Sequence, residues 1–159
     1  MPHAKAKDTS DVRIVATNRK ARHLYHIGET WEAGIALRGA EVKSLRSGAA
    51  SLADSYAEPV QGEVWLMNCH IPPYEQANRF NSDSKRRRRL LLHRKEIRKI
   101  TGAVSQKGYT LVPLRLYFQG QHVKVEIALS RGKKEYDKRE DIKDRETRRE
   151  LDRYVKMRR

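Results

Sequence analysis

The side chains of this sequence that could do chemistry are mostly cationic, and the densest group is the run Lys85, Arg86, Arg87, Arg88 and Arg89. Adjacent guanidinium and ammonium groups can neutralise successive phosphates of a nucleic acid. Three leucines that end at Leu92 follow the run and could add an apolar contact. A solvated surface loop is the alternative for such a run. The strong positive charge of the whole chain favours RNA contact over that alternative.

A second basic group mixes cations with an amide and with rings. Its members are Asn18, Arg19, Lys20, Arg22, His23 and Tyr25. Cations hold phosphates, whereas amides and rings can hydrogen-bond or stack on bases that are not paired, so the mixture suits looped RNA better than a duplex groove. Tyr25 could instead belong to the core, because rings at strand positions usually pack.

The sequence gives little support for a catalytic or metal-binding site. Cys69 and His70 could form a thiol and base pair, but neighbours on a strand point to opposite faces. The six histidines show no metal spacing with the single cysteine, and there is no HExxH motif or paired CxxC motif. Glu32 stands in a basic context, where it could pair with a cation or accept hydrogen bonds from base amino groups. The sequence predicts a binding protein that is not an enzyme and uses no metal or cofactor.

The composition indicates which partner such a surface would have. The chain has 159 residues, with 35 Lys and Arg against 20 Asp and Glu and a net charge of +15. This excess calls for a polyanion, either nucleic acid or an anionic membrane. Apolar runs are only a few residues long, far short of the ~20 that span a bilayer. The polar N-terminus and the single cysteine fit a cytoplasmic protein without membrane attachment.

Strands and short helices must position these groups. Apolar residues from 24 to 37 predict a long strand with a bulge at Gly28-Glu29. Val42 and Leu45 then predict a short helix that ends at Gly48 and carries Lys43 and Arg46 on its other side.

Further strand patterns follow in the second half of the chain. Trp65, Met67, Cys69 and Ile71 alternate with polar and apolar neighbours until Pro72-Pro73. Residues 78–89 look like a loop, and the spacing of Ile97, Ile100 and Val104 predicts an amphipathic helix. Residues 112–129 predict a hairpin that turns at Gly120, with one face in the core. Pro113 places its strand at an edge or makes it irregular.

This order of elements favours a mainly β fold with short helices, of the type of an oligonucleotide-binding (OB) β-barrel. A ferredoxin-like βαββαβ sheet is the competing fold. We expect residues 1–11 to be flexible, residues 12–131 to form the barrel and residues 132–159 to form a basic tail. The tail has few apolar side chains, but it has acid and base pairs such as Asp141 and Arg145 at helical spacing. We therefore expect it to be disordered alone and helical when docked.

Six sequence blocks, taken together and in order, resemble one family. They are Asn18 to His23, Glu32 to Ile35, Glu41 to Arg46, Leu90 to Leu92, Lys107 to Leu114 and Gly132 to Arg139. From about Ala16 to the C-terminus, the chain resembles the small protein B family, the SsrA-binding proteins. The resemblance implies an OB-type barrel that binds the tRNA-like domain of transfer-messenger RNA (tmRNA, or SsrA RNA). It also implies delivery of this RNA to the stalled 70S ribosome in trans-translation.

Carried over by motif, the resemblance places six residues and the basic run on the RNA-facing side. These six are Asn18, Arg19, Lys20, His23, Glu32 and Leu92. Arg22, Tyr25, Lys43 and Arg46 complete the expected RNA-binding set. The expected decoding-centre residues of the tail are Gly132, Lys133, Lys134, Tyr136, Asp137, Lys138 and Arg139. Tyr154 and Val155 are expected in the empty message channel of the small subunit. A generic ribosome-associated RNA-binding protein is the alternative, and we expect a monomer in either case.

Overall fold

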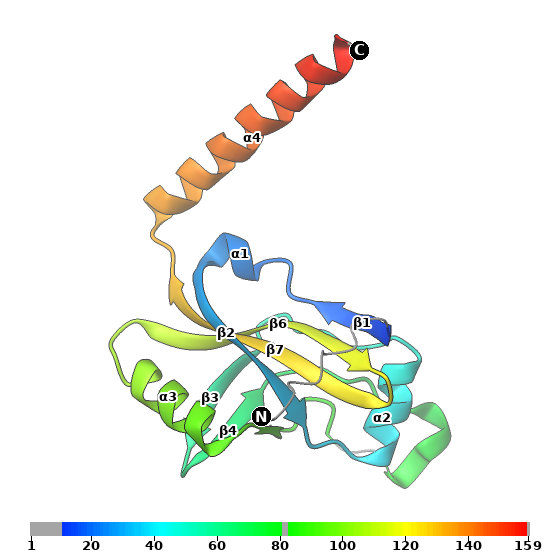
Figure 1. The fold of residues 1–159 in the computed structure, drawn as a ribbon. Helices are drawn as coiled ribbons and strands as arrows, with labels where there is room; N and C mark the ends of the chain where they lie inside the picture. Colours follow the sequence, from blue (N-terminus) through cyan, green and yellow to red (C-terminus); the bar gives the residue numbers. More distant parts are fainter. Residues whose placement is uncertain (1–10, 81–82, 159) are drawn as a thin grey trace, which may run out of the picture.

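The structure is a computed structural model that describes residues 11–80 and 83–158. Seven strands make one sheet (Figure 1). The strands are β1 (Val12–Thr17), β2 (Tyr25–Ile35), β3 (Tyr56–Val60), β4 (Glu63–Met67), β5 (Arg88–Leu91), β6 (Tyr109–Gln119) and β7 (His122–Gly132). The helices are α1 (Ala21–Leu24), α2 (Gly39–Arg46), the 3-10 helix η2 (Glu75–Phe80), α3 (Arg94–Val104) and α4 (Glu135–Met157).

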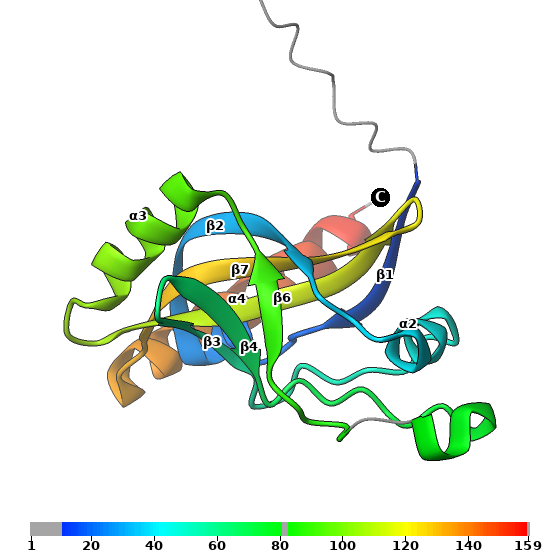
Figure 2. The ribbon, with the colours of Figure 1, turned by 90° about the horizontal axis from the view of Figure 1, so that it is seen from below.

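The strand pairings form a closed circuit. β2 pairs with β7, β7 with β6, β6 with β3, β3 with β4, β4 with β5 and β5 with β2, while β1 lies along β6. Every pair is antiparallel. Figure 2 shows α2 and α3 on opposite sides of these strands. The prediction of a mainly β fold with short helices is confirmed, and the circuit differs from a ferredoxin-like βαββαβ sheet.

The long strand predicted over residues 24–37 and its bulge are confirmed as β2. β2 shifts its register against β7 between Ile27 and Thr30, across the predicted bulge. At Gly28 a Cβ atom would lie only 2.9 Å from the carbonyl oxygen of Leu129, so only glycine lets the two strands approach this closely. β2 is shorter than predicted at both ends, because Leu24 belongs to α1 and the strand ends at Ile35.

Both predicted helices of the body are present. In α2, Leu45 is buried while Lys43 and Arg46 are exposed, as the spacing predicted. The chain leaves α2 through Gly48, whose φ of +85° favours glycine. In α3, Ile100 is fully buried and joins the main core cluster. Each helix thus covers the strands with one apolar face.

The strand predicted from Trp65 to Ile71 was wrong in extent and phase. β4 ends at Met67 and buries Leu66, while Trp65 is half-buried. Asn68 has a φ of +57°, which interrupts the alternation, and Cys69 and Ile71 are then buried. A left-handed residue shifts the two-residue period by one, so the buried positions change from even to odd numbers.

The later hairpin is confirmed, but its first strand is buried on both faces. β6 pairs with β1, β3 and β7, so it is not an edge strand. Its register against β7 shifts between Pro113 and Arg115, which confirms the predicted irregularity. Because of this shift, Leu114 packs in a small second cluster with Val112, whereas Leu116 packs in the main core.

Further segments differ from prediction or fall outside it. β1, α1 and β3 were not predicted. The predicted loop 78–89 contains the end of η2 and the start of β5. Except for Asp11, the predicted flexible segment 1–11 lies outside the described residues.

The predicted tail helix is present as α4, which projects away from the strands (Figure 1). None of its described side chains is buried. The structure therefore has the helical form that we expected for the docked tail, and disorder of the free tail stays a prediction. In the part of the chain that the structure describes, no helix is both long and apolar enough to cross a membrane.

Candidate nucleic-acid interface

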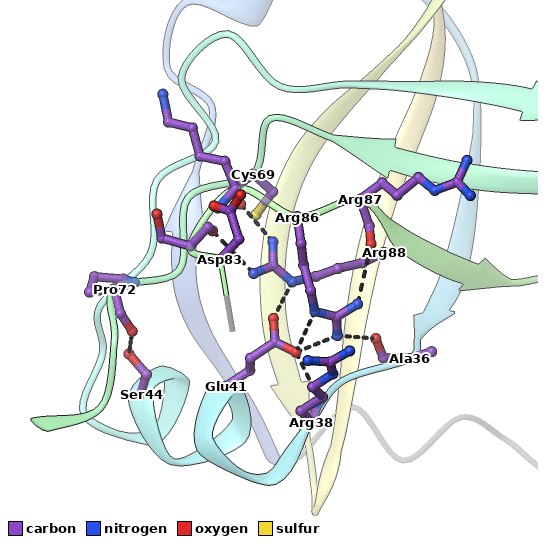
Figure 3. Close-up of polar contacts among 12 residues, drawn as sticks. Ala36, Arg38, Glu41, Ser44, Cys69, Pro72, Asp83, Arg86, Arg87 and Arg88 are labelled. Atoms are coloured by element: carbon purple, nitrogen blue, oxygen red, sulfur yellow. Dashed lines mark hydrogen bonds and ion pairs between the residues drawn. The ribbon is translucent and has the colours of Figure 1, made fainter. Parts of the chain in front are cut away.

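The basic run Lys85 to Arg89, which leads into β5, has some side chains in the interior and others at the surface. Arg88 is fully buried, and its Nε atom donates to the carboxylate of Glu41 (Figure 3). Its Nη1 atom donates to the carbonyl oxygen of Cys69 at 2.7 Å, and its Nη2 atom to that of Ser84 at 3.1 Å. Arg88 was predicted in a phosphate clamp. In this structure its guanidinium is occupied by the protein, which corrects that prediction.

Arg86 shares the same carboxylate. Its Nε atom lies 3.2 Å from Oε1 of Glu41, and its Nη2 atom forms a second contact with that oxygen. Burial alone would raise the pKa of Glu41, but hydrogen bonds from Arg86, the Arg38 backbone and Arg88 together hold it below its ordinary value. Arg86 was also predicted to bind RNA. Its guanidinium instead neutralises a buried carboxylate, because a buried charge needs a partner.

The remaining members of the run are exposed. Lys85 and Arg87 are exposed in the segment before β5, and Arg89 is exposed within β5, where its neighbours Arg88 and Leu90 point to the buried face. The Arg87 guanidinium lies over the Trp65 ring, 4.5 Å from its centroid. Arg89 forms a surface ion pair with Glu63 at 3.1 Å. Among the described residues, Lys85 and Arg87 are thus the members of the run whose side chains form no ion pair, although the backbone N–H of Lys85 donates to Asp83 at 3.0 Å.

The residues around α1 line an open groove of about 660 Å³. Asn18 is fixed on β6, since its amide nitrogen Nδ2 donates to the carbonyl oxygen of Pro113 at 3.0 Å. Arg19 and Lys20 are exposed at the wall of this groove. Tyr25 is half-buried and packs against the second core cluster, which favours the packing interpretation that the sequence left open. Arg22 is exposed on α1.

A second groove, of about 840 Å³, brings Glu32 and Leu92 together. The buried Tyr117 donates its hydroxyl to the carboxylate of Glu32, which fixes the position of that carboxylate. Burial and this hydrogen bond raise the pKa of Tyr117, so the hydroxyl remains a donor. Lys124 lines the same groove, although it was not among the residues expected to bind RNA. It pairs with Gly34, two residues after Glu32, and this register between distant strands cannot be read from the sequence.

Lys43 and Arg46 lie apart from both grooves. Arg46 lines a smaller hollow with Arg13 and Phe118, at the far end of β6. Lys43 lies 5.7 Å from the centre of the Tyr74 ring. The structure therefore does not bring these two candidates together with the residues around α1.

At the start of the tail, some side chains contact the body of the protein and others are exposed. Lys133 donates to the carbonyl oxygen of Arg22 at 2.7 Å and also to Asp141. Asp137 lies 3.2 Å from His26, and this contact and the Lys134 backbone lower the pKa of Asp137. Lys133 and Asp137 were predicted as decoding-centre residues. In this structure they contact the body of the protein instead.

The other predicted tail residues are accessible. Lys134, Tyr136 and Arg139 are exposed, and Lys138 is half-buried. Gly132 is the last residue of β7. Leu151, Tyr154 and Val155 form an exposed apolar group at helical spacing, with Tyr154 70% exposed. Across residues 11–80 and 83–158, no three His, Cys, Asp or Glu side chains are grouped as metal ligands would be.

Comparison with known proteins identifies the family. Residues 15–157 match the family described as SmpB protein. An SsrA-binding protein of Pelotomaculum thermopropionicum is 56% identical over 147 residues, which cover 92% of this chain and 96% of the relative. One from Roseiflexus castenholzii is 58% identical over 147 residues, covering 92% and 93% of the two chains.

A solved structure agrees with these relatives. It is described as "tmRNA-SmpB: a journey to the center of the bacterial ribosome", and its chain is 52% identical to this one with a TM-score of 0.64. The match covers 75% of this chain and 84% of that chain. The family match spans both grooves and the tail helix. This chain therefore belongs to the SmpB protein family.

Proposed function

We propose that this protein binds the tRNA-like domain of tmRNA and delivers it to stalled ribosomes, where incomplete proteins are tagged for degradation. Relatives that are 53–58% identical are named SsrA-binding protein. The similar solved chain comes from a structure of tmRNA-SmpB in the bacterial ribosome. The protein acts by binding, and it does so in the cytoplasm, as a monomer, without a metal or cofactor.

The folded body, residues 12–131, is the RNA-binding domain, and its closed circuit of strand pairings is an OB-type barrel. Such barrels bind oligonucleotides through exposed strands and loops. Support comes from the circuit itself and from the position of both grooves on its strands and connections.

The observation that carries the proposal is the second groove. It holds a fixed carboxylate, Glu32, beside a cation, Lys124, and an apolar side chain, Leu92. A carboxylate accepts hydrogen bonds from base amino groups, a lysine holds a phosphate, and a leucine packs on a base or sugar. These three groups together suit RNA with accessible bases.

Phosphate contacts come from the exposed cations. Arg19, Lys20 and Arg22 supply them around α1, and Lys85 and Arg87 supply them before β5. His23 joins the α1 group. Lys43, Arg46 and Arg89 extend the basic surface, while Arg86 and Arg88 hold the loop that presents their neighbours.

The tail acts on the ribosome. Gly132 connects it to β7, and Lys134, Tyr136, Lys138 and Arg139 contact the decoding centre. The exposed group of Leu151, Tyr154 and Val155 becomes covered when α4 lies in the empty message channel. A charged helix of this kind gains stability when it docks.

The test is binding to the tRNA-like domain of tmRNA and to an ordinary tRNA of equal length. We expect clearly tighter binding of the tmRNA domain at physiological salt, with a log–log salt slope of about −0.7 per contacted phosphate. Equal affinities would favour a generic ribosome-associated RNA-binding protein and would refute the proposal.

A further inference from the structure

The bulge in β6 decides which way two of its side chains point. β6 lies beside β7, and β7 beside β2 (Figure 1). The register against β7 shifts between Pro113 and Arg115, with Leu114 as the extra residue. In regular pairing Arg115 would lie opposite Val125, which is fully buried in the main core. The shift places Arg115 opposite Glu126 instead, so the bulge turns its side chain from the core to the outer face.

On this outer face, Arg115 contacts the groups that surround Glu32. Glu32 lies directly opposite Glu126 in the pairing of β2 with β7, and like charges in such positions repel. The Nε atom of Arg115 donates to the carboxylate of Glu126 at 2.5 Å. Its guanidinium also lies over the ring of Tyr117, 4.9 Å from the centroid, and the hydroxyl of that ring donates to Glu32. Arg115 thus neutralises one carboxylate and packs on the residue that fixes the other.

Asn18, at the end of β1, supplies two hydrogen bonds to the bulge. Its backbone N–H donates to the carbonyl oxygen of Leu114 at 2.8 Å. Its side-chain amide nitrogen Nδ2 donates to the carbonyl oxygen of Pro113 at 3.0 Å. Leu114 and Pro113 are both buried, and a bulge disrupts the regular ladder in which buried carbonyl groups find donors. The side chain of Asn18 therefore stabilises the bulged conformation of β6.

We propose that Asn18 and Arg115 are positioning residues for Glu32. Asn18 holds the β6 bulge, and the bulge aims Arg115 and Tyr117 at the outer face, where they fix the Glu32 carboxylate. This inference rests on the proposed function, in which Glu32 accepts hydrogen bonds from RNA bases. Asn18 lines the first groove and Glu32 the second, so the bulge connects the two grooves. Base recognition in the second groove thus depends on a residue of the first.

The first measurement follows the carboxyl carbon of Glu32 by NMR in the free protein. In Asn18→Ala and in Arg115→Gln, its signal should move toward the position that it has in Tyr117→Phe, because the same hydrogen bond weakens. Lys20→Ala is the matched control, since Lys20 is exposed in the same groove as Asn18, and it should leave the signal in place. An unmoved signal in either test variant would overturn the proposal. Arg115→Gln keeps both hydrogen bonds of Asn18, so it remains decisive if Asn18→Ala does not fold.

The second measurement is a double-mutant cycle on the affinity of the full chain for a transcript of the tRNA-like domain of tmRNA. Asn18→Ala should weaken binding about 3-fold to 10-fold in the otherwise unsubstituted protein, but less than about 2-fold when Glu32→Ala is already present. Residues that act through one another are not additive, whereas independent contacts are. Lys20→Ala should therefore weaken binding by the same factor in both backgrounds. Equal factors for Asn18→Ala in the two backgrounds would refute its action through Glu32.

The two measurements separate this inference from the proposed function. If Glu32→Ala bound the transcript as tightly as the unsubstituted protein, the RNA-binding role of Glu32 would be refuted. The carboxyl signal of Glu32 in Asn18→Ala and Arg115→Gln would still decide whether these residues position it. If Glu32→Ala weakens binding while the Glu32 signal stays in place in both variants, the proposed function stands and the positioning role is refuted.

Discussion

The buried guanidinium of Arg88 forms an ion pair with the carboxylate of Glu41, which joins the start of β5 to α2. Arg86 binds the other oxygen of the same carboxylate. A segment that looks like a uniform basic run in the sequence is therefore held at two alternate positions and open to solvent at the others. This pairing explains how a loop with so many like charges keeps one conformation.

The ion pair predicts a dependence of stability on acid pH. The pKa of Glu41 in the folded state lies below its ordinary value of 4.5. Stability from this group is therefore present above pH 4.5 and lost as the pH falls through the lower folded pKa. We expect Glu41→Gln to lose about 3–5 kcal/mol at neutral pH and to flatten the decline below pH 4.5. Denaturant unfolding from pH 3 to 7 measures both effects.

Glu63→Gln is the control for that series. Glu63 pairs with Arg89 at the surface, where its side chain is 42% exposed, so its loss should cost about 0–1 kcal/mol. If Glu41→Gln and Glu63→Gln had the same stability at neutral pH, the buried pair of Arg88 and Glu41 would not stabilise the fold as predicted.

Substitutions of two adjacent arginines should have different effects, one on the stability of the fold and the other on RNA binding. Arg88→Ala leaves the buried Glu41 with one partner fewer and should lower the free energy of unfolding by about 3–5 kcal/mol. Arg87→Ala removes an exposed cation over Trp65 and should cost only about 0.5–1 kcal/mol. It should weaken RNA binding and reduce the salt slope by about 0.7. Thermal melts and RNA titrations at two salt concentrations test both variants, and a reversed pattern would contradict the assignment.

The hydroxyl of Tyr117 should matter for both stability and RNA binding. Tyr117→Phe keeps the ring but removes the hydrogen bond to Glu32, and bonds to charged groups contribute about 1.5–3 kcal/mol. Without this donor, the carboxylate is no longer fixed in the second groove, so RNA affinity should also fall. Tyr109→Phe, in the same strand, is the control, because its hydroxyl has no hydrogen-bond partner among the described residues. Similar behaviour of the two variants would show that Glu32 is not positioned by Tyr117.

Part of this fold could be predicted from the sequence because its pattern is local. The alternation in β6 and β7, the spacing of Ile97 and Ile100, and the bulge at Gly28 each depend on a few neighbouring residues. The left-handed Asn68 reverses an alternation without any residue type that demands it. The strand prediction failed at that point.

The candidate site could also be predicted only in part. Arg19 and Lys20 were correctly expected at the surface, because basic side chains are usually exposed. Burial of Arg88 depends on Glu41, 47 residues away, and the attachment of Lys133 depends on Arg22, 111 residues away. A pattern of neighbouring residues does not contain such partners. The alternation with the buried Leu90 was the available signal that Arg88 and Arg86 point inward.

The bulge in β2 predicts that position 28 does not tolerate a side chain. In Gly28→Ala the new Cβ would meet the backbone of Leu129 at 2.9 Å, so the two strands must separate, at a cost of about 1–3 kcal/mol. Gly102→Ala is the matched control, because it lies in α3 with nothing within 4 Å of its Cβ position. It should gain about 0.5–1 kcal/mol. Denaturation midpoints compare them, and equal stabilities would mean that β2 and β7 are not held at this distance.

The central claim is that the folded body binds tmRNA while the tail acts on the ribosome. It is tested most directly by comparing the full chain with a chain that ends at Gly132, in a reconstituted translation system with tmRNA and a message that lacks a stop codon. α4 has no buried residue, so the shortened chain should keep its fold and its RNA affinity. We expect tagging of the stalled peptide with the full chain, and loss of tagging with undiminished RNA binding in the shortened one. Tagging by the shortened chain, or a large loss of its RNA affinity, would contradict it.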